Sequence, residues 1–123
     1  ILFSDSSRKK YGFYLPVLPP RVAKKKGIWG CNWGIRKNTL LAINGFDEDY
    51  VHAGIGEDVD VEWRLRKTGC KFYYLPQRLI VYHLHHDSNY TQEEVNININ
   101  LLREKQRAGL IYCSKGLQNT KEG

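Results

Sequence analysis

The sequence predicts a single α/β domain in which helices flank a mixed sheet. Two segments with helix-capping signals, at 56–69 and 91–109, favour helices, and three short aromatic or β-branched runs, at 29–35, 71–75 and 79–82, favour strands. Helical and extended segments therefore alternate along the chain, as they do in α/β proteins. A chain of 123 residues has room for one modest core and buries about two-thirds of its unfolded surface.

This domain divides into a basic loop region at 1–27, a motif core at 28–88 and a C-terminal helix and tail at 89–123. The net charge is +6, from 19 Lys and Arg against 13 Asp and Glu. Much of it lies in Arg8-Lys9-Lys10 and in Arg21 to Lys26, where prolines favour a loop. Such a segment suggests an anionic partner, or else a solvated loop. We do not expect nucleic acid to be that partner, because no binding motif with interleaved aromatic and glycine positions is present.

The motif core opens with a strand-like aromatic segment, Trp29 to Ile35. A short helix within 36–48 follows, and Gly45 ends it, since glycine is the usual residue at a left-handed helix stop. The predicted order is therefore strand, helix, loop and acidic helix.

The acidic segment 56–69 gives two conflicting signals. Its apolar residues alternate, which taken alone favours a half-buried strand; they are Val59, Val61, Trp63 and Leu65. Its charges favour a helix, because four carboxylates come first and three cations last, matching the helix dipole. Asp60 with Arg64 and Glu62 with Arg66 become i,i+4 ion pairs, each worth about 0.2–0.5 kcal/mol. We predict a helix that ends at Gly69 and packs against the rest of the protein through apolar side chains on two of its faces.

Two adjacent carboxylates, Glu57 and Asp58, begin this helix directly after the flexible loop 53–56. Crowding two carboxylates costs free energy unless the site uses them. An acid pair presented at the start of a rigid helix suits a general base. The alternative is a solvated helix N-terminus with favourable dipole interactions.

Two strand-like runs follow, at 71–75 and 79–82, interrupted by Pro76. They lead into the cluster His83-Leu84-His85-His86. On a strand His83 and His85 share a face, whereas a turn brings His83 and His86 together. Either pair could hold a divalent cation, and the alternative is a solvated polar surface.

The C-terminal region begins with a capping box, Thr91-Gln92-Glu93-Glu94, which opens a helix running to about Ala108 with Gly109 as its stop. We expect this helix to be structural and to pack on the sheet or on a second copy of the chain, as in a homodimer. The tail from Leu110 carries no signal.

Composition favours a soluble protein of a reducing compartment, which we expect to be the cytoplasm. Hydrophobic residues make up 41% of the chain, no apolar stretch approaches the length of a membrane span, and no signal peptide is visible. Cys31, Cys70 and Cys113 are odd in number and lack metal-ligand spacing, which favours free thiols.

Taken in order, these motifs resemble the acceptor-side, C-terminal half of a GT-A glycosyltransferase, with family-2 and β-1,4-galactosyltransferase-like enzymes as the nearest pattern. The matching segments are Gly30 to Ile35, Leu41 to Asp47, Gly56 to Asp60, Arg64-Leu65 with Gly69, and the late histidines. The likeness covers about residues 27–88, and the combination is more specific than any one motif. It implies a partial GT-A fold that lacks the N-terminal nucleotide-binding half, and hence an isolated chain that does not transfer sugar.

The resemblance implies a role for each carboxylate of the acid pair. Asp58 would be the catalytic base, and Glu57 would orient the acceptor. Trp33, Asn32 and Trp29 are candidate acceptor-binding residues, with core packing as the alternative for the two tryptophans. One departure from many relatives, Gly54 and Ile55 in the loop before the acid pair, means that the acceptor is not carried over.

The same resemblance implies a bound Mn²⁺ or Mg²⁺ that neutralises the departing diphosphate, with His86 or His83 as a ligand and His85 as a weaker candidate. Asp58-Val59-Asp60 has the spelling of an Asp-x-Asp metal motif but belongs to the acceptor motif. The implied partners are a nucleotide-sugar donor, such as a UDP-hexose or UDP-N-acetylhexosamine, and a glycan or lipid-linked glycan acceptor in polysaccharide synthesis at the inner face of a membrane. The alternative is a catalytically silent carbohydrate-binding or assembly module that keeps the shape of such a half.

Overall fold

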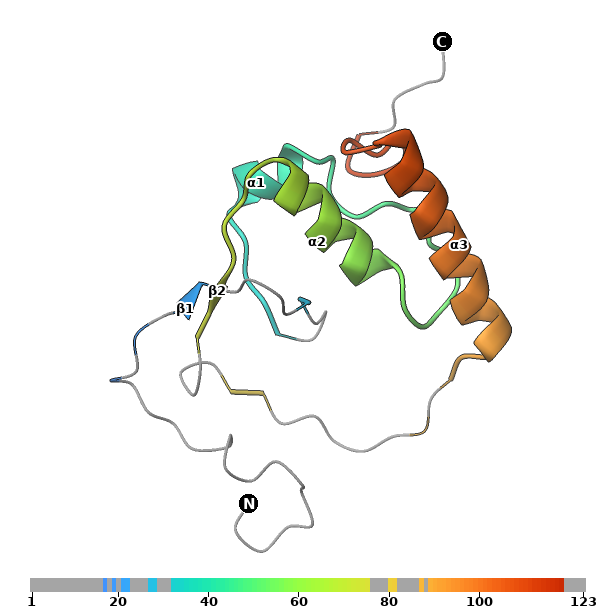
Figure 1. Cartoon of the computed structure of the whole chain (residues 1–123), viewed down its shortest axis with the longest axis horizontal. Coiled ribbons are helices and arrows are strands. Elements are labelled where there is room, and N and C mark those ends of the chain that lie inside the picture. Colours follow the sequence, from blue (N-terminus) through green and yellow to red (C-terminus); the bar gives the residue numbers. More distant parts are fainter. Residues whose placement is uncertain are drawn as a thin grey trace, which may run out of the picture. The chain divides into compact units, whose positions relative to one another are not determined.

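In a computed structural model of the chain, the described residues form three helices and one small antiparallel ladder (Figure 1). The structure describes residues 17, 19, 21–22, 27–28, 32–75, 80–81, 87 and 89–118. These residues group into two compact units, one drawn from 1–26 and 71–86, the other from 27–70 and 87–123.

The first unit contains strands β1 (Arg21–Val22) and β2 (Tyr73–Tyr74), which pair antiparallel with Arg21 opposite Tyr74 and Val22 opposite Tyr73. The run at 71–75 therefore contributes a strand of two residues, and both tyrosines are exposed. Residues 80 and 81 are not in a strand, whereas the rest of the predicted run at 79–82 lies outside the described residues. Among the described residues this ladder is the whole sheet, and the partial GT-A architecture stays a prediction.

The second unit contains helices α1 (Lys37–Leu41), α2 (Glu57–Lys67) and α3 (Gln92–Ala108). Its buried apolar residues come from α2, α3, the turn after α1 and the C-terminal segment; they are Ile43, Val61, Leu65, Val95, Leu102 and Cys113. Within the described part of the chain, no helix is long and apolar enough to cross a bilayer.

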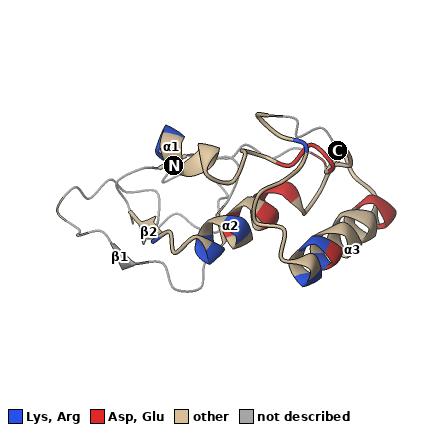
Figure 2. Cartoon of the chain, turned by 90° about the horizontal axis from the view of Figure 1, so that it is seen from above, with Lys and Arg blue, Asp and Glu red and all other residues tan. Residues whose placement is uncertain are grey.

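Helix α2 confirms that charge order outweighs apolar alternation in segment 57–67. Acidic residues occupy its first turn and basic residues its last turn, and Figure 2 shows the two charges separated along the helix. Both predicted ion pairs form, and Gly69 adopts the left-handed conformation at φ 80°. The two-face prediction is wrong for Val59, which is 39% exposed, because the buried stripe of α2 runs through Asp60, Val61, Arg64 and Leu65.

Helix α3 also forms as predicted, with both halves of the capping box in place. The Thr91 hydroxyl accepts from the Glu94 amide at 3.2 Å, and the Glu94 carboxylate accepts from the Thr91 amide at 2.7 Å. Gly109 ends the helix at φ 68°. The buried stripe, Val95, Asn98, Leu102 and Lys105, packs inside the second unit against the segment that leads into α2.

The strand prediction for 29–35 is wrong over the described residues 32–35, which have no regular secondary structure. Trp33 lies against Phe46 with ring centroids 6.0 Å apart and planes at 53°. Gly34 weakens any strand here, since glycine has low β-propensity. α1 is also shorter than predicted, because the chain leaves it at Leu41 and enters a turn with Asn44 and Gly45 both at positive φ.

Candidate active site

The acid pair lies at the start of α2, as the sequence predicts. Glu57 and Asp58 are its first two residues, and both are half-buried. The carbonyl of Gly56, the residue before them, accepts a hydrogen bond from the Asp60 amide at 2.8 Å, and this bond closes the first turn. Two carboxylates at the positive end of a helix dipole interact favourably with that dipole, and they can accept hydrogen bonds from a bound molecule.

The other two carboxylates of α2 are engaged in ion pairs. Asp60 accepts from the Arg64 Nε at 2.6 Å, and both side chains are fully buried. Glu62 accepts from Arg66 at 2.7 Å and from the backbone amide of Ile28 at 2.8 Å. The four acids of the segment therefore separate into a structural pair inside the helix and an acid pair at its start.

Arg64 connects α2 to the turn after α1. Besides its bond to Asp60, its Nη1 donates to the Ile43 carbonyl at 2.6 Å. Burial raises the pKa of Asp60, and the Arg64 charge opposes that effect. Burial, together with the negative charge of Asp60, also raises the pKa of Tyr50, so its phenol stays protonated. Asp60 is thus a buried structural acid and is not the residue presented to a ligand.

The loop before α2 is packed closely against α3, whereas the sequence suggested a flexible loop. A Cβ on Gly54, at φ 109°, would lie 2.9 Å from Val95 Cγ2. A Cβ on Gly56 would lie 2.8 Å from Tyr50 Cδ1 and 3.0 Å from Asn98 Cβ. Because these two glycines have no side chain, the backbone of the loop can pack closely against α3. This contact fixes the path of the chain into the acid pair.

The turn at 43–49 is held by the C-terminal segment, a contact that sequence reasoning missed. The Asn44 Nδ2 donates to the carbonyls of Cys113 at 2.8 Å and Gln118 at 2.7 Å, and its Oδ1 accepts from the Gln118 amide at 2.8 Å. The tail from Leu110, which carried no signal in the sequence, therefore stabilises this turn. Cys113 is a core residue, and its burial raises the pKa of its thiol. A thiol with a raised pKa is a poor nucleophile.

Two aspartates of the same turn connect it to α3. The Lys105 Nζ lies 2.5 Å from Asp47 Oδ2 and 2.6 Å from Asp49 Oδ2, and Lys115 reaches Asp49 at 2.9 Å. Burial works against the charge of Lys105, but the bonds to both aspartates outweigh it and raise its pKa. Lys105 and Lys115 hold the pKa of Asp49 below its ordinary value.

Trp33 and Phe46 form an aromatic pair at the surface of the second unit. Trp33 is half-buried and Phe46 is 41% exposed. Phe46 was not among the predicted site residues, although it belongs to the Leu41 to Asp47 segment, and its contact with Trp33 is the signal that adds it. Asn32, beside Trp33, is exposed. A ring pair of this kind can stack on the apolar face of a ligand.

The remaining predicted site residues, Trp29, His83, His85 and His86, lie outside the described residues. The structure brings together Glu57 with Asp58 and Trp33 with Phe46. No group of three or more His, Cys, Asp or Glu side chains among the residues it describes could hold a metal ion.

Comparison with known protein families finds a match. A family model described as the N-terminal domain of galactosyltransferase matches residues 21–87, more than half of the chain. The matched range contains the acid pair, Trp33 and Phe46. The description of this family names an N-terminal domain. The motifs of the sequence, the acid pair above all, resemble instead the acceptor-side, C-terminal half of a glycosyltransferase. No curated protein and no solved structure matches the chain.

Proposed function

Since this chain belongs to the galactosyltransferase domain family that its residues 21–87 match, we propose that it supplies the catalytic base and the acceptor side of an inverting, metal-dependent glycosyltransferase. The donor is a nucleotide sugar, either a UDP-hexose or a UDP-N-acetylhexosamine, and the acceptor is a glycan or lipid-linked glycan of a surface polysaccharide. The matched family is a domain, so the activity belongs to the complete enzyme that contains it.

The observation that carries the proposal is the place of the acid pair. Glu57 and Asp58 are the first two residues of α2, and both are half-buried. Asp58 takes the proton of an acceptor hydroxyl while the oxygen forms a bond to the anomeric carbon of the donor. The bond from that carbon to the nucleoside diphosphate breaks on the opposite side, so the configuration inverts. Glu57 accepts a hydrogen bond from the acceptor and orients it.

A divalent cation is part of this proposal. Mn²⁺ or Mg²⁺ would neutralise the charge of the departing diphosphate. We assign His86 or His83 as the ligand from this chain, on the motif resemblance alone, since both lie outside the described residues. The other ligands belong to the nucleotide-binding half.

The proposal is tested by a transfer assay on the complete enzyme with a panel of UDP-sugars, with Mn²⁺ and with a chelator. The 123-residue chain is assayed beside it. We expect product from the complete enzyme only, and only with metal, because the proposal assigns the base and the acceptor contacts to this chain and the donor site to the nucleotide-binding half. Silence of the complete enzyme across a broad donor and acceptor panel would favour a catalytically silent binding module.

The aromatic pair gives a second expected result. Phe46→Ala should raise the acceptor KM about tenfold, equivalent to roughly 1.4 kcal/mol, while kcat changes little, because stacking on the acceptor is made equally in the ground and transition states. Tyr73→Ala is the control, since Tyr73 is an aromatic residue that is 59% exposed and does not belong to the aromatic pair. An unchanged acceptor KM in a folded Phe46→Ala enzyme would remove the aromatic pair from the acceptor site.

A further inference from the structure

We propose that Asn98 of α3 is a positioning residue for the acid pair. The Asn98 side chain is 1% exposed, and its Nδ2 donates to the His52 carbonyl at 2.9 Å. Its Cβ also borders the space where Gly56 lies, immediately before Glu57. The consequence for catalysis rests on the proposed function, because it matters to the reaction only if Asp58 is the base.

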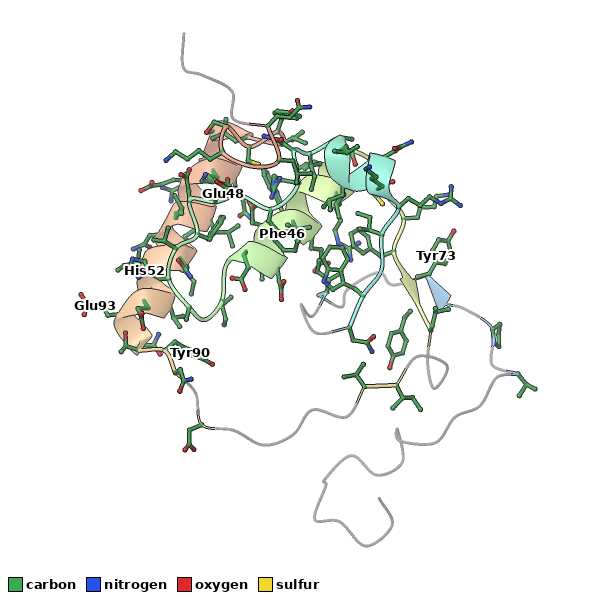
Figure 3. The ribbon with its side chains drawn as sticks, turned by 180° about the vertical axis from the view of Figure 1, so that it is seen from behind. Phe46, Glu48, His52, Tyr73, Tyr90 and Glu93 are labelled. Carbon is green, nitrogen blue, oxygen red and sulfur yellow. The ribbon has the colours of Figure 1, made fainter. Side chains whose placement is uncertain are left out.

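Asn98 contacts the loop before α2 at two places four residues apart. At His52 it holds a carbonyl by a hydrogen bond, and at Gly56 it leaves no room for a side chain. Between them Gly54 lies against Val95, one turn earlier on the same stripe of α3. Figure 3 shows His52 beside α3, and the His52 Nδ1 also lies 3.9 Å from Glu94 Oε1. Both ends of the segment that presents the acid pair are therefore fixed to one helix.

The choice of asparagine at this position is informative. Asn98 lies on the buried stripe of α3 between Val95 and Leu102, where an apolar residue would pack without polar atoms to satisfy. Asparagine lowers helix propensity, and burying its amide costs free energy unless it is hydrogen-bonded. Asn96 and Asn100 flank it at exposed positions of the same helix. The stripe thus carries a polar residue where the loop carbonyl of His52 needs a donor.

This arrangement fixes the direction in which the first turn of α2 leaves the loop. A general base acts only when its carboxylate lies within hydrogen-bond reach of the acceptor hydroxyl. Small displacements of such a group reduce the rate of the chemical step more than they affect donor binding. Asn98 acts on the reaction through the backbone at His52 and Gly56 and does not itself contact the substrate.

The test is Asn98→Leu in the complete enzyme, which keeps the size of the side chain and removes the donor. We expect kcat to fall about ten- to a hundredfold with the donor KM unchanged. Amide hydrogen exchange at residues 53–58 should become roughly fivefold faster, the weight of one net hydrogen bond, while exchange in the Val61 and Leu65 turn stays slow. Asn100→Leu, the same change at an exposed position of α3, should alter neither quantity.

Asn98→Gln keeps an amide donor on a longer side chain and should recover part of kcat and of the exchange protection. It also serves as the test if the leucine variant does not fold. Normal kcat and normal exchange at 53–58 in a folded Asn98→Leu enzyme would overturn the proposal, as would faster exchange spread evenly over α2 and α3. Failure of the base assignment is seen separately, as transfer by an Asp58→Asn enzyme, and leaves the exchange result standing.

Discussion

Asp58→Asn in the complete enzyme should reduce sugar transfer by about 10²- to 10⁴-fold, the usual contribution of a general base. The substitution keeps the shape of the side chain and removes its ability to take the proton of the acceptor hydroxyl. Asp58 is half-buried at the first turn of α2, and the substitution keeps the size of its side chain, so the fold should survive. The measurement is kcat at saturating donor and acceptor, together with the thermal unfolding midpoint.

Glu62→Gln is the matched control for this prediction. It makes the same acid-to-amide change on the same helix, at a carboxylate that is engaged with Arg66. We expect Glu62→Gln to keep near-normal kcat and to lose less than about 1 kcal/mol of stability, because its ion pair is partly exposed. Transfer by Asp58→Asn at near the wild-type rate would mean that another group takes the acceptor proton.

Arg64→Leu should lower the free energy of unfolding by about 3–5 kcal/mol, the usual result of leaving a buried charge without its partner. Asp60 would remain fully buried, and the Ile43 carbonyl would lose the hydrogen bond from Arg64. Small domains are stable by only about 5–15 kcal/mol, so the loss is a large fraction of the total. Urea unfolding measures it, provided that the m-value stays constant.

Two further variants separate charge from packing. Arg66→Leu, the same substitution two residues along α2, breaks a pair with side chains 35% and 13% exposed, and should cost less than about 1 kcal/mol. The double variant Asp60→Leu with Arg64→Leu removes both buried charges and should recover much of the single variant's loss. A double variant as unstable as the single one would show that the shape of the two side chains, and not the uncompensated charge, stabilises the helix.

Arg64→Leu should also strengthen the dependence of stability on pH that Asp60 contributes. Burial raises the pKa of Asp60 even beside Arg64, and removing the cation takes away the effect that opposes burial. The folded Arg64→Leu protein then binds a proton more readily than the unfolded chain does. Its free energy of unfolding should therefore rise as the pH falls through the raised pKa of Asp60 toward the ordinary aspartate value near 4. A decrease over that range would show that Asp60 finds another cationic partner.

Local signals predicted the helices of the second unit well. Thr91 with Glu94 marks one helix start, Gly109 and Gly69 mark two stops, and charge order identified α2 against its misleading apolar alternation. These features work because capping and i,i+4 contacts involve neighbours in sequence. The strand prediction over 32–35 was wrong for a related reason, since an aromatic run looks the same whether it pairs in a sheet or packs on Phe46.

Contacts over long distances in sequence were not predictable from one chain. The Asn44 side chain bonds to Cys113 and Gln118, and Lys105 bonds to Asp47. No periodicity or spacing in the sequence predicts either contact. For the site, the place of Glu57 and Asp58 at a helix start was predicted and is confirmed. Their chemical roles remain predictions, because a carboxylate at a helix start has the same local structure whether or not it accepts a proton.

Helix α3 also fixes the distance between two points of the segment that leads to the acid pair. Lys105 holds Asp47 and Asp49, and Asn98, two turns away, holds His52; the two attachment points are about 10 Å apart along the helix axis. Two apolar side chains of this segment, Val51 and Ile55, are 77% and 51% exposed. Substitution at these two positions can therefore change the surface of this segment while the backbone that carries Glu57 and Asp58 keeps its place.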